Sequence, residues 1–161
     1  MPFGSLLAFG NEGAAITSDD GQHCQVIKNL QDSIFEMTTP GAKQPIYSRG
    51  SAGIYVSRDG GQSFTLVTQH SYASLTASPD QPNVLYGKLA LGVYRSSDGG
   101  KTWSQLPAIK GNLQTLVADP SNPNQGVFAY PPETVYSFRG DMQKPPFTGE
   151  ILSSALLFDE L

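Results

Sequence analysis

Short runs of alternating apolar and polar residues, separated by Gly, Pro, Asn and Asp, recur along the whole chain. This two-residue period, with β-branched and aromatic side chains, is typical of β-strands. No window shows the 3.6-residue apolar stripe of an amphipathic helix, and only the segment 149–161 is a plausible helix. A strand is preferred there too. In the clearest unit, strands are expected at about 72–77, 84–88, 92–96 and 102–106.

An eight-residue motif recurs at a spacing of about 40 residues, the signature of a repeat architecture. Ser57–Phe64 and Ser96–Trp103 are strong copies, and Thr17–Cys24 is a weaker one. All three fit Ser/Thr-x-Asp-x-Gly-x-x, followed by an aromatic residue in the strong copies. The motif positions are Thr17, Asp19, Gly21, Ser57, Asp59, Gly61, Phe64, Ser96, Asp98, Gly100 and Trp103.

Each residue of the motif suits a turn between two strands. The Asp carboxylate can accept hydrogen bonds from backbone N–H groups of its own turn, and the Ser or Thr hydroxyl can do so more weakly. Gly permits a positive φ, and the aromatic ring can pack over the turn. We therefore expect these Asp residues to hold turns together. Asp-Gly-rich loops also suggest calcium, but the closing acidic residue of an EF-hand loop is missing, so no metal is expected.

These motifs resemble the Asp-box (BNR) repeats of sialidases, sortilin-type receptors, xyloglucanases and photosystem II assembly propellers. The stretch Ala118–Asn124, together with Gly92–Trp103, is most similar to repeats of the last three groups. The resemblance implies an all-β fold, a small β-propeller of about four four-stranded blades. Such propellers usually have six or more blades. The chain is therefore a small closed ring, half of a ring that a second copy completes, or a reduced relative.

The blade repeats are expected at about 1–28 together with 150–161, then 29–69, 70–108 and 109–149, in a single domain 1–161. The fourth unit has lost its motif and keeps only flanking strands. The first unit begins with its second strand, Ser5–Phe9, and lacks an inner strand. Ile151–Asp159 resembles the other inner strands and can complete the first blade, which would cover an open sheet edge.

Composition narrows the function. The net charge is −4 without Lys/Arg runs, so neither nucleic acid nor an anionic membrane is an expected partner. The single cysteine, Cys24, excludes an internal disulfide framework and is expected to be small, apolar and buried. No signal peptide or membrane span is visible, which makes the cytoplasm the default location. His23, expected to face solvent, and His70 are isolated, so no catalytic triad or cofactor site is expected.

Sialidase chemistry needs an arginine cluster, and none of Arg49, Arg58, Arg95 and Arg139 lies in the Arg-Ile/Leu-Pro motif that opens sialidase domains. A pair of carboxylates for glycoside hydrolysis stays open, because Glu12, Glu36, Glu133 and Glu150 are available.

Ligand binding is expected on the loops opposite the motif turns, and in the irregular segment 141–150 with its exposed Phe. The candidate residues are Glu12, Arg49, His70, Tyr72, Lys88, Lys110, Tyr130, Glu133 and Phe147. The favoured function is a non-catalytic scaffold, an accessory subunit that binds protein partners in a larger assembly, with self-association to complete the ring as a further possibility. A carbohydrate-binding, lectin-like module is the alternative, and a glycosidase relative comes third.

Overall fold

The computed structural model describes residues 5–41, 44–79, 81–89, 92–110, 115–118, 125–130, 134–139 and 144–147, with side chains up to residue 106. The described residues form antiparallel sheets and no helix. The first sheet contains β1 (Leu6–Gly10), β2 (Gly13–Thr17) and β3 (Gln25–Val26). The second contains β4 (Ile34–Thr38), β5 (Ile46–Gly50), β6 (Ile54–Ser57) and β7 (Thr65–Thr68).

The third and fourth sheets repeat this arrangement. The third contains β8 (Ser74–Ala77), β9 (Leu85–Leu89), β10 (Gly92–Ser96) and β11 (Ser104–Lys110). The fourth contains β12 (Thr115–Ala118), β13 (Gln125–Tyr130), β14 (Thr134–Arg139) and β15 (Lys144–Phe147). Within each sheet, every strand pairs with the strands that come before and after it in the chain, so each sheet is a meander. The all-β prediction is confirmed.

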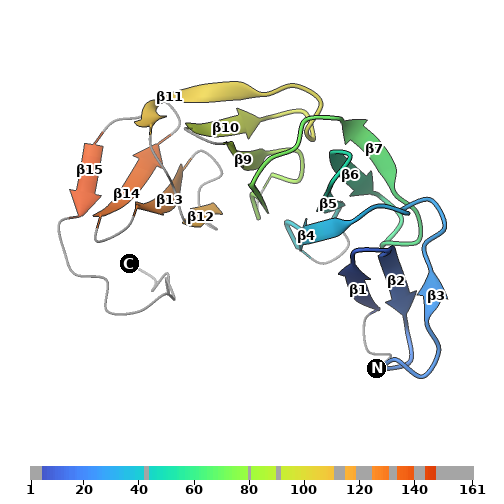
Figure 1. Cartoon of the computed structure of the whole chain (residues 1–161). Helices are drawn as coiled ribbons and strands as arrows, with labels where there is room; N and C mark the ends of the chain where they lie inside the picture. Colours follow the sequence, from blue (N-terminus) through green and yellow to red (C-terminus); the bar gives the residue numbers. More distant parts are fainter. Residues whose placement is uncertain are drawn as a thin grey trace.

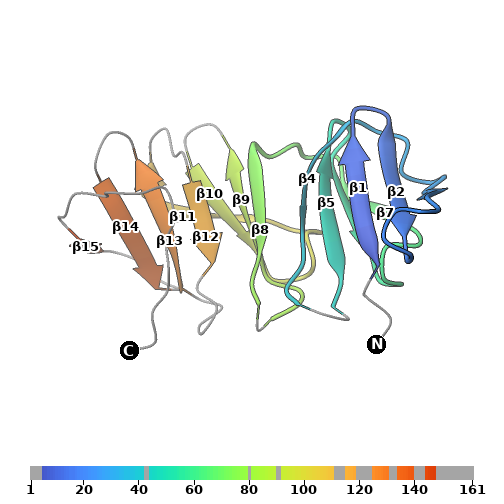
Figure 2. The same cartoon turned by 90° about the horizontal axis from the view of Figure 1, so that it is seen from below.

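The four sheets stand side by side in an arc (Figure 1), and a view at right angles shows their strands running roughly alongside one another (Figure 2). The first strand of each later sheet lies on the inside of the arc. The innermost described strand of each sheet, called its inner strand from here on, contacts that of the next sheet: β1 with β4, β4 with β8, and β8 with β12. The first and fourth sheets lie at the two ends of the arc.

Apolar side chains fill the spaces between successive sheets. Between the first and second sheets, Ala14, Leu30, Ile34 and Phe64 are buried in one cluster. A second cluster joins the second and third sheets, and its members are Tyr47, Ile54, Val56, Tyr72, Leu75, Ala77 and Leu85. Because burying a large aliphatic side chain stabilises by roughly 1.5–3 kcal/mol, these clusters hold one sheet on the next.

The fourth sheet corrects one prediction. The irregular segment after Arg139 contains a strand, β15, which pairs with β14 through Val135 and Phe147. Its sequence, Lys-Pro-Pro-Phe, does not predict a strand, because Pro has no backbone N–H to donate to a β-ladder. An outermost strand tolerates Pro, since one of its edges has no strand to pair with. The predicted inner strand at Ile151–Asp159 lies outside the described residues.

A membrane-spanning helix would need a long apolar helical segment, and the described part of the chain contains none.

Candidate binding surfaces

The motif turn of the second sheet, Ser57–Phe64, is closed by hydrogen bonds among its own residues. The Ser57 hydroxyl donates to Asp59 Oδ1 at 2.8 Å and accepts the Gly61 N–H at 2.8 Å. The Asp59 carboxylate also accepts the backbone N–H of Ser63 at 3.0 Å and its hydroxyl. Gly61 has a φ of +93°, a conformation that L side chains rarely adopt.

The turn of the third sheet repeats these contacts. The Ser96 hydroxyl donates to Asp98 Oδ1 at 2.8 Å and accepts the Gly100 N–H at 2.9 Å. Asp98 accepts the Thr102 N–H at 2.9 Å. Trp103 then folds over the turn, and its indole Nε1 donates to the Gly100 carbonyl oxygen at 2.8 Å. Each residue of the motif therefore stabilises the turn.

The weaker copy in the first sheet keeps the same arrangement, with the ring of His23 where the strong copies have the hydroxyl of Ser63 or Thr102. The Thr17 hydroxyl donates to Asp19 Oδ1 at 2.8 Å, and Asp19 accepts the His23 N–H at 2.9 Å. The His23 ring lies 2.6 Å from the other carboxylate oxygen and is largely exposed. His23 is thus at the surface, as predicted, where it contacts a turn carboxylate.

Hydrogen bonding favours the charged form of these carboxylates. The hydroxyl and N–H of Ser63, with Ser57, lower the pKa of Asp59 to about 2. Desolvation acts to raise the pKa of Asp98, but bonds from Thr102, Ser96 and the backbone outweigh it and lower that pKa to about 2. The pKa of Asp19 is lowered chiefly by the backbone N–H and ring of His23.

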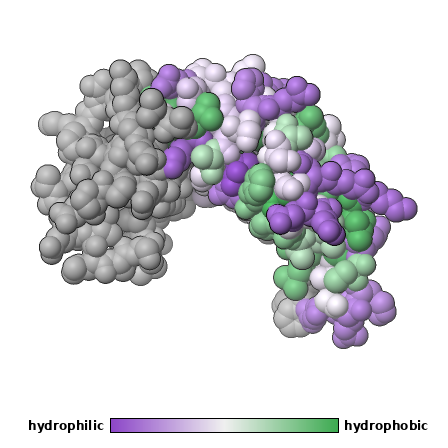
Figure 3. All heavy atoms as spheres, in the orientation of Figure 1, coloured by the Kyte–Doolittle hydropathy of each residue, from purple (hydrophilic) through white to green (hydrophobic). Residues whose placement is uncertain are grey.

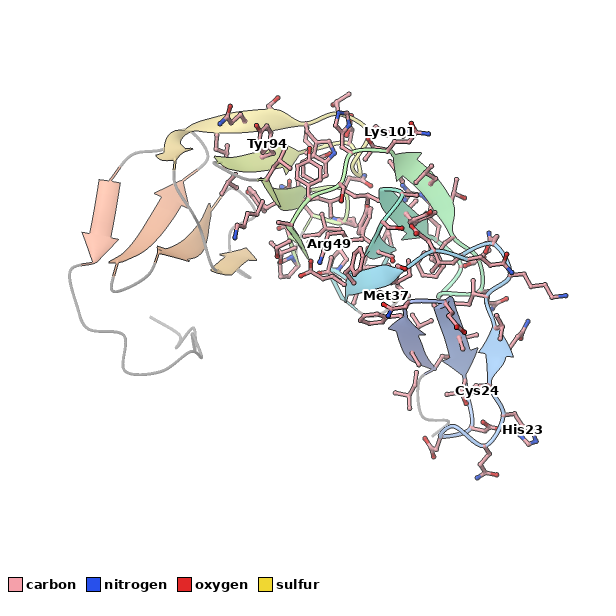
Figure 4. The ribbon with its side chains drawn as sticks, in the orientation of Figure 1. His23, Cys24, Met37, Arg49, Tyr94 and Lys101 are labelled. Atoms are coloured by element: carbon pink, nitrogen blue, oxygen red, sulfur yellow. The ribbon has the colours of Figure 1, made fainter. Side chains whose placement is uncertain are left out.

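The prediction that Cys24 is buried is wrong, because this side chain is exposed. The equivalent Phe64 is 3% exposed and packs in the cluster that joins the first and second sheets. Trp103 packs in the same way against the cluster between the second and third sheets. The aromatic position therefore faces the preceding sheet. Within the described residues no sheet precedes the first, and Cys24 lies with His23 at the tip of a turn (Figure 4).

The prediction that Tyr72 lies on an exposed binding face is also wrong. It is 4% exposed, and its ring centroid lies 4.4 Å from that of Trp103 and 5.9 Å from that of Tyr94. Burial raises its pKa to about 12. The residue precedes the inner strand β8, where the chain enters the space between two sheets, so its ring turns into the core.

Arg49 lies on the inner side of the second sheet (Figure 4), where its charge is paired. Its Nε is 3.2 Å from Glu36 Oε2, and its guanidinium lies 5.1 Å from the centre of the Phe35 ring. Glu36 also accepts the Leu75 N–H at 2.8 Å and the Ser74 hydroxyl at 3.3 Å. The pair therefore ties β4 and β5 to the inner strand β8 of the next sheet.

The remaining predicted residues divide into three groups. Glu12 is exposed at the β1–β2 turn, and exposed His70 has its Nδ1 3.0 Å from the Thr68 hydroxyl. Lys88 is half-buried on β9. Three further residues end strands: Lys110 ends β11, Tyr130 ends β13 and Phe147 ends β15. Their side chains are not among those that the structure describes, and Glu133 lies outside the described residues. The described members are thus spread over three sheets.

Sequence reasoning missed Asp32, which lies between β3 and β4. Its carboxylate accepts the Ser51 hydroxyl, the Ala52 N–H at 2.9 Å and the Tyr55 hydroxyl at 3.0 Å. Desolvation opposes ionisation, yet these bonds keep its pKa below the ordinary value. No local motif marks Asp32, because its partners lie 19 to 23 residues further along the same unit, at the β5–β6 turn and on β6. The carboxylate of Asp32 therefore accepts its hydrogen bonds from groups of the protein itself.

Apolar side chains are exposed on the inner strands at the first end of the arc. Phe9 on β1 is 46% exposed and Phe35 on β4 is 49% exposed. We call these two residues the inner aromatic pair. β1 and β4 contact each other, which places the pair on neighbouring strands. Half-exposed aromatic side chains of this kind are enriched where proteins bind one another.

A shallow groove of about 580 Å³ lies between the second and third sheets on the side of the motif turns. Arg58, Leu66, Val67 and Lys101 contribute to its lining, and Asp59 lies in it with its carboxylate already hydrogen-bonded. In the described part of the chain, no group of three or more His, Cys, Asp or Glu residues could hold a metal ion.

Known structures with this arrangement of sheets are β-propellers. The chain matches an ancestral GH74 enzyme with a TM-score of 0.59 at 24% identity, over 85% of this chain and 22% of the enzyme. It matches YCF48 bound to D1 peptide with a TM-score of 0.57 at 18% identity, over 90% of this chain and 50% of that protein.

TolB from Acinetobacter baumannii gives a TM-score of 0.63 at 15% identity, over 91% of this chain and 42% of TolB. No protein-family model and no curated protein matches the sequence. The chain thus spans half or less of each of these structures, and the likeness concerns the fold. The chain has the fold of a β-propeller, in an arc of four sheets.

Proposed function

We propose that this propeller is a non-catalytic protein-binding module, an accessory subunit of a larger assembly. The observation that carries the proposal is the inner aromatic pair, Phe9 and Phe35, on neighbouring inner strands. Both rings expose apolar surface to solvent, and a bound protein could cover that surface. Aromatic anchors near the centre of an interface supply much of the binding energy between proteins.

Five carboxylates of the described residues support a binding role over a hydrolytic one, because each is held by several hydrogen bonds. Asp19, Asp32, Asp59 and Asp98 each accept several hydrogen bonds inside turns or between loops. Glu36 is held by Arg49 and by backbone of the next sheet. A general acid or nucleophile must be free to exchange a proton or attack a substrate, whereas these groups stabilise structure.

The structural neighbours include both a peptide-binding protein and enzymes. YCF48 was solved with a bound peptide, while two GH74 structures are enzymes. The likeness to YCF48 makes a peptide segment with apolar side chains a reasonable ligand for the inner aromatic pair. A lectin-like role is the second candidate, because half-exposed aromatic rings also stack against sugar faces. A glycosidase relative is the third.

Affinity capture from the native source tests the first candidate, with the whole chain as bait. Proteins retained by the wild type should fall at least tenfold with Phe35→Ser, because an anchor ring is lost. Leu66→Ser is the matched control, since Leu66 is 40% exposed on the outer strand β7. Equal capture by all three baits would contradict the proposal.

The other candidates have separate assays. Binding of the wild type on a glycan array, lost in Phe35→Ser, would replace the protein-binding proposal with the lectin. The glycosidase would be established if the wild type released reducing sugar from a panel of polysaccharides and replacement of one acidic residue abolished this release.

A further inference from the structure

The groove of about 580 Å³ between the second and third sheets carries two cations. Arg58 comes from the motif turn of the second sheet, and Lys101 comes from that of the third, on the outer side of the arc (Figure 4). Both side chains are exposed, and neither is ion-paired with a carboxylate of the described residues. Arg58 reaches across the junction, since its Nη2 lies 3.5 Å from the position of a Cβ added at Gly99.

The motif turns do not need these charges in order to fold. The junction between the first and second sheets has a groove of about 460 Å³ at the corresponding place. There, Ser18 stands at the motif position of Arg58, and Gln62 stands at the motif position of Lys101. The turns close through the same kind of hydrogen bonds at both junctions. The two cations are therefore available for a ligand.

The groove of the two cations attracts negative charge. Asp59 supplies the carboxylate in its lining, and this carboxylate accepts hydrogen bonds from Ser57 and Ser63. Two cations against one carboxylate leave the lining positive, although the whole chain has a net charge of −4. A positive groove on an acidic protein favours an acidic ligand over a basic one.

The same groove follows the edge of β7, the outermost strand of the second sheet. Thr65, Leu66 and Val67 of β7 all line it. Because successive side chains of a strand point to opposite faces, a groove that contacts three successive residues includes the edge of the strand. Among the described strands β7 pairs with β6 alone, and an unpaired edge readily accepts another strand. Figure 3 shows hydrophilic residues, in purple, gathered along the outer side of the described sheets.

A side chain of the protein already pairs with the backbone just before β7. Asn29 Nδ2 donates to the Phe64 carbonyl oxygen at 2.7 Å, and Asn29 Oδ1 accepts the Phe64 N–H at 3.2 Å. In a regular strand the backbone groups of residues two apart point to the same edge. The backbone groups of Leu66 therefore point the same way as those of Phe64, and a bound strand would continue the pairing there.

We propose that this groove binds an extended acidic peptide segment of another protein, which adds a strand to the edge of β7. The peptide backbone pairs with β7, and its Asp or Glu side chains meet Arg58 and Lys101. A guanidinium can hold a carboxylate through two parallel hydrogen bonds, and pairing with a sheet edge supplies affinity through the main chain. The site goes beyond the inner aromatic pair, because β1 and β4 lie on the inside of the arc and β7 lies on its outside (Figure 1).

Selection from a random-peptide phage library tests the site, with the whole chain as bait. Peptides enriched on the wild type should carry Asp or Glu. As synthetic peptides, they should bind the Arg58→Ser, Lys101→Gln double variant at least tenfold more weakly in fluorescence polarisation, because the charged hydrogen bonds are lost. This variant carries the residue types of the first groove, which suit the turn. Lys28→Gln is the control, since Lys28 is exposed outside the groove, and it should bind like the wild type.

Methylation of the peptide backbone tests the pairing itself. Alternate N–H groups of an added strand point toward β7. Methylating one alternate set of peptide amides should therefore weaken binding at least tenfold, and methylating the other set should leave it within about twofold. Leu66→Ser should keep binding within about fivefold, because its side chain contributes only a cross-strand contact.

Phe35→Ser separates this site from the inner aromatic pair. The variant should bind the selected peptides like the wild type, whatever it does to the capture of proteins from the native source. Urea unfolding followed by Trp103 fluorescence verifies that each variant is folded.

Three results would overturn the proposal. They are a selection that enriches no acidic peptide, equal binding of the enriched peptides to the wild type and the double variant, and equal effects of the two methylation patterns. Heparin, a sulfated polysaccharide, serves as a further probe. Heparin binding that is lost in the double variant, without peptide binding, would assign the groove to an anionic glycan instead.

Discussion

Asp98 illustrates how single residues work in this protein. Its carboxylate accepts N–H groups of Lys101 and Thr102 and the hydroxyls of Ser96 and Thr102. Four residues of a surface turn are thereby held together without burying a large apolar group. Hydrogen bonds to a charged acceptor are stronger than bonds between neutral groups, so a small polar turn can fix the connection between two strands.

Asp98→Asn should lower the free energy of unfolding by about 1 to 2 kcal/mol, because the amide loses the charge and one acceptor oxygen. Urea unfolding followed by Trp103 fluorescence measures the change. Asp20→Asn is the control: Asp20 has a φ of +57°, which Asn also tolerates, so its stability should stay within about 0.5 kcal/mol. A loss of the same size in both variants would contradict the assigned role.

Acid should weaken the fold through the same carboxylates. Asp59 and Asp98 have a pKa of about 2 when folded, below the 3.8 of an ordinary Asp, so the folded state binds their protons less tightly. Their contribution to stability is therefore complete above about pH 4 and is lost as the pH falls through about 2. Unfolding midpoints in urea should drop over this window. The Asp59→Asn, Asp98→Asn double variant should show a flatter profile, and an unchanged slope would argue against these groups.

At the scale of elements, sheets join through apolar clusters and through a few polar ties across the junction. Glu36 on β4 is one such tie, since it accepts the Leu75 N–H of β8 while pairing with Arg49 of β5. Neighbouring turns also contact one another, as the Gly99 N–H donates to the Asn83 carbonyl oxygen at 2.8 Å. These contacts fix how one sheet follows the next.

Glu36→Gln should destabilise the protein by about 1 kcal/mol or more, because Arg49 and the Leu75 N–H lose a charged acceptor. Chemical denaturation gives the loss. Glu12→Gln serves as the control, since Glu12 is exposed at a turn. Combining Glu36→Gln with Arg49→Met should cost less than the sum of the two single changes, because the residues share one interaction. Strict additivity would show that they act separately.

At the scale of the whole molecule, protection from solvent is uneven. β5, β6 and β9 are each paired on both edges and carry fully buried residues such as Tyr47, Ile54 and Tyr86. β3 has two exposed residues, pairs on one edge and follows a turn at the surface. The second and third sheets thus form the centre of the arc, and the first sheet is its least covered described end.

Hydrogen exchange should reproduce this order. Amides of β5, β6 and β9 should exchange slowest, and those of β3 should exchange at least a hundredfold faster, because fraying needs little loss of packing. Mass spectrometry of peptic peptides reports both. Uniform exchange across the four sheets would contradict this account.

The repeat made much of this fold predictable. Turn residues and strand positions in the third sheet follow from local sequence, because turn chemistry acts over a few residues. Tyr72 and Cys24 were misassigned for a common reason. Whether a side chain is buried depends on the sheet it faces, and that neighbour belongs to another repeat. β15 was missed because the tolerance of Pro depends on an edge position.

Local sequence is enough to specify the motif turns, because each turn is made by residues within eight positions of one another. It also determined the all-β class through its two-residue period. The tertiary structure was needed to show that the described sheets form an arc, that Arg49 is bound by Glu36, and that Phe9 and Phe35 are exposed. These features depend on which sheets lie next to one another, and packing between repeats decides that.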